Sequence, residues 1–488
     1  MSLSDPVYIG LLLLCVVLFY LLRVGQPRRV LLLASSYLFY FQLSHYYIAV
    51  LLAITAISYF GARWLRAPAI GSRGPILFTL LCAIVLTPLL LLKYLSPVLL
   101  AVGGGTAFGH LGHELVTLAL PVGISFFTFV ALGYLVDVYL EVVDPEMDAS
   151  RLALFLAFFP LISAGPIERA SSFLPQLDLQ QRFSAERAFA ALRLILIGLV
   201  LKLCFASALF VPIKQIYAAP QNFSAFEQLC GTIYCAFYLY SDFAGYSLIA
   251  IGSAKLFGLE VRPNFCQPFL SASVPEFWRN WHMSLSSWVR DYLFSPLRMT
   301  WRRSGNLGLS AALFISFVVI GVWHGPQWGW VVFGVVHGVL CIGSAFTLPR
   351  RDAWLKASPI PGWLVYGWRV VVTFLIVELT FVLAWAKSVP DALHMYRSIF
   401  SPELFRNIAA APGWYLYHKG GYPVLVTGER WWVLIGLLVA GDILARRKFK
   451  WERVPLALQL CLYNIALLLV LLKWLNGLGN EPFAYYKF

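Results

Sequence analysis

Residues 309–345 read LSAALFISFVVIGVWHGPQWGWVVFGVVHGVLCIGSA, a stretch that contains no aspartate, glutamate, lysine or arginine. A helix needs about 20 mostly apolar residues to cross the roughly 30 Å of hydrocarbon in a bilayer. Proline disfavours the α conformation in the residue before it and removes one backbone donor. The stretch therefore predicts a membrane-embedded helix that breaks or restarts beside His324, at Gly325-Pro326.

Apolar windows like this one recur along nearly the whole chain and decide the fold class. The chain has 488 residues, of which 60% are hydrophobic and only 12% charged, and its mean hydropathy is +0.76, far above that of an ordinary soluble domain. We expect an all-α, polytopic integral membrane protein with about eleven transmembrane helices. The windows lie at 7–24, 30–43, 46–62, 75–101, 116–140, 187–212, 225–258, 309–345, 364–386, 431–445 and 455–475.

The first window resembles a signal peptide only in being apolar. It follows Asp5 instead of a basic segment, and no small-residue cleavage site precedes Arg23. We expect it to remain as a membrane span.

The net charge of +14 comes from short basic clusters at the ends of these windows. Loops rich in lysine and arginine stay on the cytoplasmic side, which predicts an N-terminus outside. The basic balance is explained in this way without a nucleic-acid partner. The clusters are Arg23, Arg28 and Arg29; Arg63, Arg66 and Arg73; Arg302 and Arg303; Arg350 and Arg351; and Arg446, Arg447, Lys448 and Lys450.

Neither the cysteines nor internal symmetry indicate a further kind of site. The eight cysteines are scattered through apolar windows without a CxxC pair or a Cys/His cluster, so we expect free thiols, no metal and no disulfide framework. No internal repeat is visible, which disfavours a secondary transporter. We expect one membrane domain over residues 1–488, with 388–430 as the one connection long enough for an extracytoplasmic excursion.

The segment FWRNWHMSLSSWVRDYLF, residues 277–294, is amphipathic if it is placed on a helix. Aromatic and arginine side chains on opposite faces are typical of an interfacial anchor. An anchor does not need His282, which falls on the polar stripe. The apolar face holds Phe277, Trp281, Leu285, Trp288 and Tyr292, and the polar face holds Arg279, His282, Ser286 and Arg290.

Two further histidines lie in the window that opened this section. Non-helical backbone at membrane depth is tolerated only where it is buried in protein or lines a water-filled cavity, so His324 at a helix break is a functional candidate. A neutral imidazole can equally be a hydrogen-bonded packing residue. For His337 the packing interpretation is favoured, because Gly334 and Gly338 flank it at a spacing that suits close helix packing.

Histidines in an apolar enclosure indicate base chemistry on a hydroxyl group. Imidazole has a pKa near 6.5, and burial lowers that value by disfavouring the charged form, so the ring stays neutral and ready to accept a proton. The sequence lacks the GxSxG, HExxH, P-loop and GxGxxG signatures of other enzyme classes.

Several stretches resemble the membrane-bound O-acyltransferase family, and together they cover most of residues 120–340 and the extreme C-terminus. The segments EFWRNWHMSLSSWVRDYLF and GVWHG are similar to its two signatures, and further stretches are similar to its bacterial branch, which acetylates exported polysaccharides such as alginate. These stretches are LPVGISFFTFVALGYLVDVY (120–139), FFPLISAGPIERASSFLPQL (158–177), YSDFAGYSLIAIGSAKLFGLEVRPNF (240–265) and EPFAYYKF (481–488).

The resemblance implies a helical core, at about 120–345, around a tunnel across the inner membrane of the cell. His324 of the WHG motif would be the general base, and His282 a second catalytic residue that polarises or positions substrate. Acetyl-CoA is implied as the donor on the cytoplasmic side, with no bound cofactor. The acceptor would be a hydroxyl of an extracytoplasmic carrier or acetyl-relay protein, or of the exported polysaccharide. D-alanyl or other acyl transfer to a cell-envelope polymer is the alternative.

The residues near the presumed binding site of the cytoplasmic acyl donor agree with the implied acyltransferase function. Arg279 and Arg290, followed by Arg298, could meet the phosphates of CoA, and Ser286 and Trp323 complete the expected substrate-binding set together with Asp242. Asp242 and Lys255 are costly in an apolar window and indicate either a buried polar function or a structural pair. Asp137 and the Glu168-Arg169 pair either line the cavity or hold helices together, and the second interpretation is favoured.

One departure concerns the presumed donor-side loop, which reads SPLRMTWRRSGN where the alginate branch usually has a glycine-glycine-asparagine turn. A transporter of polymer or lipid-linked sugar remains an alternative. A glycosyltransferase is disfavoured, because the first loop at 43–47 has no acidic pair. The segment 388–430 and the terminal Tyr485–Phe488 are expected to dock a partner, and membrane lipids surround the chain.

Overall fold

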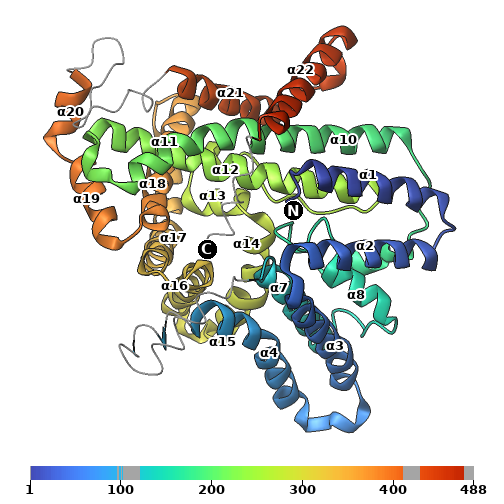
Figure 1. Cartoon of the computed structure of the whole chain (residues 1–488). Helices are drawn as coiled ribbons and strands as arrows, with labels where there is room; N and C mark the ends of the chain where they lie inside the picture. Colours follow the sequence, from blue (N-terminus) through green and yellow to red (C-terminus); the bar gives the residue numbers. More distant parts are fainter. Residues whose placement is uncertain (1, 96–97, 100–101, 103–120, 410–428, 478–488) are drawn as a thin grey trace. The chain divides into compact units, whose positions relative to one another are not determined.

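The computed structural model describes the chain except for residues 1, 96–97, 100–101, 103–120, 410–428 and 478–488 (Figure 1). The described residues form helices and contain no strand. The protein is an all-α, multi-pass membrane protein. Seven helical runs in the described part of the chain are long and apolar enough to cross a bilayer, and Pro6–Leu21 and Ile124–Tyr139 are shorter apolar helices. The expected number of about eleven spans is not confirmed.

The described residues group into two compact units, and the long helix α12 (Ala225–Leu256) contributes to both. Unit 1 contains the chain up to Gly198 together with Tyr246–Pro263. Its helices are α1 (Pro6–Leu21), α2 (Gln26–Ser44), α3 (Ile48–Leu65), α4 (Gly74–Leu90), α7 (Ile124–Tyr139), α8 (Ala149–Ala157), α9 (Ala170–Phe173) and α10 (Ala185–Leu199).

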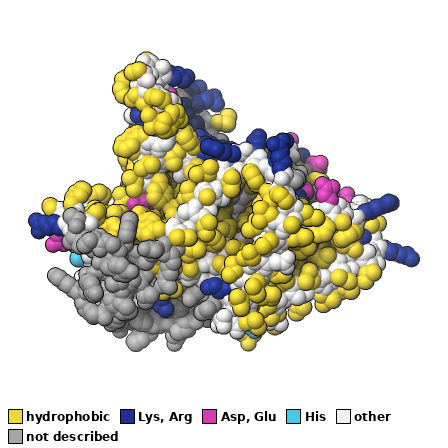
Figure 2. Space-filling view, turned by 90° about the horizontal axis from the view of Figure 1, so that it is seen from above, with side chains coloured by type: hydrophobic (Ala, Val, Ile, Leu, Met, Phe, Trp, Pro, Cys, Tyr) yellow, Lys and Arg dark blue, Asp and Glu magenta, His cyan; other side chains and the backbone are white. Residues whose placement is uncertain are grey.

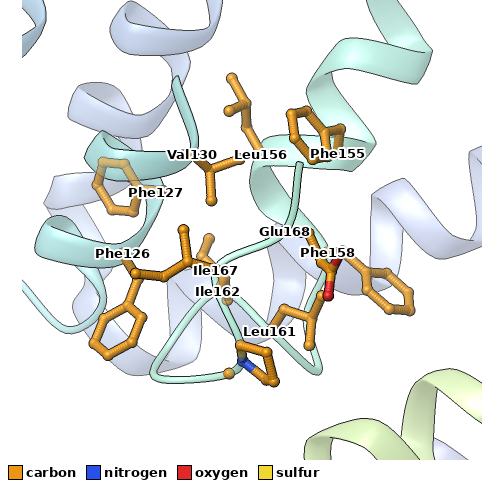
Figure 3. A pocket seen from close by; sticks show the side chains of 12 residues that line it. Phe126, Phe127, Val130, Phe155, Leu156, Phe158, Leu161, Ile162, Ile167 and Glu168 are labelled. Carbon is orange, nitrogen blue, oxygen red and sulfur yellow. The ribbon is translucent and has the colours of Figure 1, made fainter. Parts of the chain in front are cut away.

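Unit 1 is held together around a buried irregular segment, residues 158–169. The hydroxyl groups of Ser163 and Tyr246 lie 2.5 Å apart, and Glu168 accepts a hydrogen bond of 2.8 Å from the backbone N–H of Arg262. Figure 3 shows Glu168 among apolar side chains at a cavity of about 20 Å³, room for about one water molecule. Because Glu168 bonds a distant part of the same unit, the expectation that it holds elements together is supported.

Unit 2 contains Leu199–Gly245 and the described residues from Asn264 onward. Its helices include the π-helical η5 (Val200–Ala206), α11 (Ser207–Ala218), α13 (Val274–Asn280), α14 (Met283–Val289), the π-helical η8 (Arg290–Phe294), α15 (Ser295–Thr300), α16 (Gly305–His324), α17 (Trp328–Ala357), α18 (Gly362–Trp385), α19 (Val389–Ile399), α20 (Pro402–Ala409), α21 (Glu429–Arg446) and α22 (Leu456–Leu475).

The helices α16 and α17 form a tight hairpin on either side of the predicted break at Gly325-Pro326. A Cβ atom at Gly321 would lie 2.3 Å from the carbonyl oxygen of Trp330, and one at Gly334 would lie 2.5 Å from that of Phe317. Such distances leave no room for a side chain at either position. The small residues therefore let the two backbones approach closely, as the sequence predicts for Gly334.

The surface of the described residues suits a lipid environment. Hydrophobic side chains cover much of the face shown in Figure 2, and lysine and arginine side chains gather in separate clusters. On α17, Trp328 and Trp354 are 73% and 67% exposed near the two ends of the helix. Tryptophan favours the level of the lipid headgroups, which is where the ends of a spanning helix lie.

The expected extracytoplasmic excursion at 388–430 is described only in part. It begins with the short helices α19 and α20, and α19 is capped by Ser388, whose hydroxyl accepts the N–H of Asp391 at 3.2 Å. Residues 410–428 and the terminal Tyr485–Phe488 lie outside the described residues, so the expected docking role of both segments stays a prediction.

Candidate active site

The segment 277–294 is not the continuous amphipathic helix that its periodicity predicts. The helix α13 ends at Asn280, α14 starts at Met283, and His282 between them has a φ of 44° and a ψ of 53°. These values lie in the left-handed region, which is uncommon for a residue other than glycine. His282 therefore does not lie on an exposed polar stripe with Arg279, and it is only 1% exposed.

Local interactions explain why the first helix forms and why the second restarts. Ser273 caps α13 by accepting the N–H of Glu276 at 3.3 Å, and Glu276 accepts the N–H of Ala272 at 2.8 Å. At the start of α14, the N–H of Met283 donates to the carbonyl of Asn264 at 2.9 Å. Asn264 thus satisfies a helix-terminal donor that the interrupted helix leaves without an intrahelical partner.

The side chain of Asn264 fixes the protonation of His282. Its Oδ1 accepts the backbone N–H and the hydroxyl of Ser284, at 3.3 and 2.9 Å. A backbone N–H can only donate, so this atom of the amide is the oxygen. It lies 3.0 Å from Nδ1 of His282, so Nδ1 must carry the proton and donate. In the neutral ring, Nε2 then holds the lone pair that a base or hydrogen-bond acceptor uses.

Aromatic packing and burial keep His282 neutral. The ring stands edge-on to that of Phe243 at a centroid distance of 4.6 Å. Burial lowers the pKa of His282 from 6.5 to about 3, because the charged form would lose its hydration. The imidazole is therefore uncharged at neutral pH.

His324 ends α16, directly before the break at Gly325-Pro326, as the sequence predicts. It is 5% exposed, and its ring stacks on that of Trp330 at 4.5 Å with an angle of 17°. The ring of Trp323 lies 4.6 Å from that of His324 and 6.4 Å from that of His282. Both histidines, far apart in the sequence, therefore flank one indole ring.

A cavity of about 640 Å³ is formed within unit 2 by α13, α14, η8, α16 and α17. Three of the residues predicted to bind substrate line it: Arg279, Ser286 and Arg290. Most of its other walls are apolar, with hydroxyl groups from Ser287, Ser316 and Ser344. The described lining includes neither Trp323 nor Asp242.

One row of lining residues on α16 and one lining residue on α14 lead toward the histidines. On α16 the row consists of Leu309, Leu313, Ser316 and Ile320, spaced by 4, 3 and 4 residues. His324 follows Ile320 by four residues and so takes the next position on the same helical face. On α14, the lining residue Met283 directly follows His282. Neither histidine is among the described lining residues, but each is next to one: His324 one helical turn beyond Ile320, and His282 directly before Met283.

Asp242 has a structural partner that the sequence did not identify. Its carboxylate is 2.5 Å from Nζ of Lys202 on η5, and both side chains are almost fully buried within unit 2. Lys255 instead pairs with Glu260, at 3.1 Å, within unit 1. A buried charge in a membrane protein requires such a partner, so the structural-pair interpretation of Asp242 is the one that the geometry supports.

His337 has both ring nitrogens engaged. Nδ1 accepts the indole N–H of Trp278 at 3.1 Å, and Nε2 lies 2.9 Å from the hydroxyl of Thr380, which itself donates to the carbonyl of Val377. The hydroxyl must therefore accept from Nε2. These bonds support the packing role that the sequence favours for His337.

Comparisons with known proteins place these motifs among acyltransferases. The sequence model of the family described as MBOAT, membrane-bound O-acyltransferase, matches residues 146–385. The probable alginate O-acetylase of Pseudomonas aeruginosa is 30% identical over 404 residues, which are 81% of this chain and 72% of the relative.

Two other relatives act on different polymers, as their names state. The peptidoglycan O-acetyltransferase of Helicobacter pylori is 29% identical over 59% of this chain and 58% of its own length. The teichoic acid D-alanyltransferase of Bacillus subtilis is 28% identical over 51% of this chain and 65% of its own length.

Proposed function

Because this chain belongs to the membrane-bound O-acyltransferase family and is an O-acyltransferase, we propose that it transfers an acetyl group from acetyl-CoA to an exported polysaccharide. Its relatives named for alginate O-acetylation match 81% of the chain, whereas those named for D-alanyl transfer match about half of it. This difference favours acetyl over D-alanyl as the acyl group. The proposed location is the inner membrane of the cell, and an extracytoplasmic relay protein is the proposed partner.

The cavity whose α16 wall ends at Ile320, one helical turn before His324, is the observation that carries this proposal. Its volume of about 640 Å³ lies in the range of small-ligand sites. Arg279 and Arg290 can form charge-assisted hydrogen bonds to phosphate groups, while the apolar wall along α16 accommodates the arm that carries the thioester. In this arrangement the acyl group reaches the lining residues that lie next to both histidines.

The proposed reaction is a direct acyl transfer with His324 as the general base. His324 takes the proton of the acceptor hydroxyl as its oxygen attacks the thioester carbonyl. The carbon–sulfur bond then breaks, and the leaving thiolate takes up the proton that His324 removed, which returns the imidazole to its neutral form. The neutral His282, with its lone pair on Nε2, accepts a hydrogen bond from a neighbouring hydroxyl of the acceptor and so orients the acceptor beside Trp323. The products are the ester and free CoA.

The test follows radioactive acetyl from acetyl-CoA into extracytoplasmic protein or glycan, using opened membranes that contain the native acceptor. His324→Ala should abolish transfer at equal protein level. His282→Ala should reduce transfer by roughly 10²- to 10⁴-fold if His282 shares in proton transfer, and by less if it only orients the acceptor. His45→Asn, which removes an exposed imidazole outside the segment 388–430, is the control and should behave as wild type.

Two outcomes would contradict the proposal. If His324→Ala transfers acetyl at the wild-type rate, His324 is not the base. If the wild type transfers no acetyl although acceptor is present, the donor is wrong, and a D-alanyl carrier becomes the next donor to test.

A further inference from the structure

The last described helix, α22, contacts the rest of unit 2 through one narrow face. It packs against η5, and only 6% of its apolar window is buried, compared with 44% for α18. Val470 is buried, and Tyr463, Ala466 and Lys473 are half-buried. The spacing of these residues, 3, 4 and 3, places them on a single side of the helix.

Asn464 lies on the opposite side, near the middle of this apolar span. At 100° per residue, it is rotated by about 120° from Val470 and about 160° from Ala466. Its side chain is exposed, and one of its amide hydrogens donates to the carbonyl of Leu460 at 2.7 Å. The amide still has an oxygen and a second hydrogen that hydrocarbon cannot satisfy, which makes this an unfavourable group to expose to lipid.

The residues around Asn464 form a continuous exposed face that suits helix association. Ala457, Cys461, Leu468 and Leu471 share this face with Asn464, at spacings of 4, 3, 4 and 3, and all are exposed. Small residues allow two helices to approach closely in a membrane, and an amide can then bond across the interface. We call these five residues the Asn464 face.

We propose that the Asn464 face pairs with the same face of a second copy of this chain. Two copies inserted in the same orientation are related by an axis along the membrane normal, so identical residues meet at the same depth. An amide carries both a donor and an acceptor, so the two Asn464 side chains can bond each other symmetrically. A second copy supplies this partner by symmetry, whereas an unrelated helix would need a suitable polar group at that depth.

Cys461 makes the proposal testable in the full-length protein within its membrane. Among the described cysteines, Cys461 and Cys266 are exposed, and Cys82 and Cys204 are partly exposed. In a variant with Cys82, Cys204 and Cys266 replaced by serine, oxidation with copper phenanthroline should give a disulfide-linked dimer through Cys461. Adding Cys461→Ser should abolish that dimer.

Two engineered cysteines provide matched positions on the same helix. In the background that also lacks Cys461, Leu468→Cys lies on the Asn464 face and should cross-link. Leu462→Cys is equally part of the exposed helix but is rotated by about 160° from Asn464, so it should not cross-link.

The amide itself is tested by dilution in lipid vesicles, with dimer fraction measured by energy transfer between labelled copies. Asn464→Leu should weaken dimerisation by roughly 3- to 30-fold, the range for losing an interhelical hydrogen bond in a bilayer, while Asn464→Gln should retain most of it. The proposal is overturned if Leu462→Cys cross-links as well as Leu468→Cys, if the wild type is monomeric at every dilution, or if Cys461 cross-links to a different protein.

Discussion

The carboxamide of Asn264 determines which nitrogen of His282 carries the proton, although the two residues are 18 positions apart in the sequence. Three donors converge on Oδ1 of Asn264, and two of them come from Ser284. The same residue also holds the start of α14 through its backbone carbonyl. Asn264 is therefore a positioning residue for His282, because it sets the orientation and the tautomer of the ring together.

Substitution of Asn264 should separate these effects. Asn264→Leu removes the acceptor that orients the ring of His282. The rate of acyl transfer should then fall by up to roughly 100-fold, the lower limit of what acid–base catalysis contributes. Asn264→Asp keeps an acceptor for all three donors and should retain much more activity. Both variants can be compared by the labelled acetyl assay at equal protein level, and equal activity of Asn264→Leu and wild type would show that the ring does not need this bond.

Burial of His282 makes stability depend on pH in a definite direction. Its pKa is about 3 in the folded protein and 6.5 otherwise, so between these values the unfolded chain binds a proton that the folded chain does not. Above about pH 6.5 the ring is neutral in both states, so this effect on the free energy of unfolding is absent. As the pH falls from about 6.5 toward 3, protonation of the unfolded chain lowers the stability of the folded state. His282→Asn, in which asparagine tolerates left-handed backbone, should reduce this loss.

The measurement is thermal unfolding of the purified protein, followed by tryptophan fluorescence between about pH 7 and about pH 5. The drop in melting temperature across this range should be smaller in His282→Asn than in wild type. His394→Asn is the control and should follow the wild type. Parallel curves for all three proteins would contradict the assignment.

Sequence reasoning reached part of this site and missed the rest for a physical reason. Motif resemblance and the cost of a membrane histidine single out His324 and His282, and the structure places both against Trp323. Asn264 was missed as a site residue, because a lone asparagine after a proline gives no periodic signal. A buried amide reveals its role only when its hydrogen-bond partners are known.

Among the helices, the sequence predicts the break after His324, which a proline follows, but not the break at His282. Pro326 restricts the residue before it, so the end of α16 could be predicted from the sequence. The break at His282 has no glycine or proline, and the helical periodicity continues across it. It forms because Asn264 accepts the backbone N–H groups of Met283 and Ser284, a tertiary interaction that overrides the local pattern.

The hairpin of α16 and α17 should be sensitive to a single methyl group. In Gly321→Ala the new Cβ would meet the carbonyl oxygen of Trp330 at 2.3 Å. Backbone atoms cannot rotate away, so the helices must separate, at a cost of about 1–3 kcal/mol. We expect a lower melting temperature and weaker acyl transfer, because His324 lies three residues further along α16.

The matched control for this variant is Gly343→Ala on α17, since a Cβ at Gly343 meets no atom within 4 Å. It should leave both the melting temperature and transfer unchanged or slightly improved. If Gly321→Ala also leaves them unchanged, the close approach of the two helices is not important for the site.

At the scale of the whole molecule, the basic clusters predict the orientation of the chain in the membrane. Arg350 and Arg351 lie near the end of α17, so that end should face the cytoplasm and the α16–α17 turn the opposite side. In a variant that lacks the exposed Cys266 and Cys461, a membrane-impermeant maleimide should label Gln327→Cys on intact cells. Ala357→Cys should react only after the cells are opened, and the reverse pattern would contradict this orientation.

Composition and hydropathy were sufficient to predict an all-α membrane protein, but they did not fix the number of spans. The apolar run at residues 26–65 contains α2 and α3, which correspond to two expected windows and are separated by a backbone turn at His45, where φ is 30°. The runs also differ in length and in how far they are buried. These differences depend on packing between helices, which the composition of each window does not record.

The matching apolar lengths of two spanning helices tie this enzyme to the thickness of its membrane. The uncharged part of α17, residues 328–348, is about 31 Å long, and α22 is about 30 Å long. Both lengths match the roughly 30 Å of hydrocarbon in a bilayer. The turns of α17 from Arg350 onward then extend into the headgroup layer, where we expect the exposed Trp354 to lie. In a bilayer of another thickness the hairpin must tilt or the lipids must deform, at a cost that depends on lipid chain length. A cell that changes its fatty acids with temperature thereby also changes the tilt of the hairpin that carries His324.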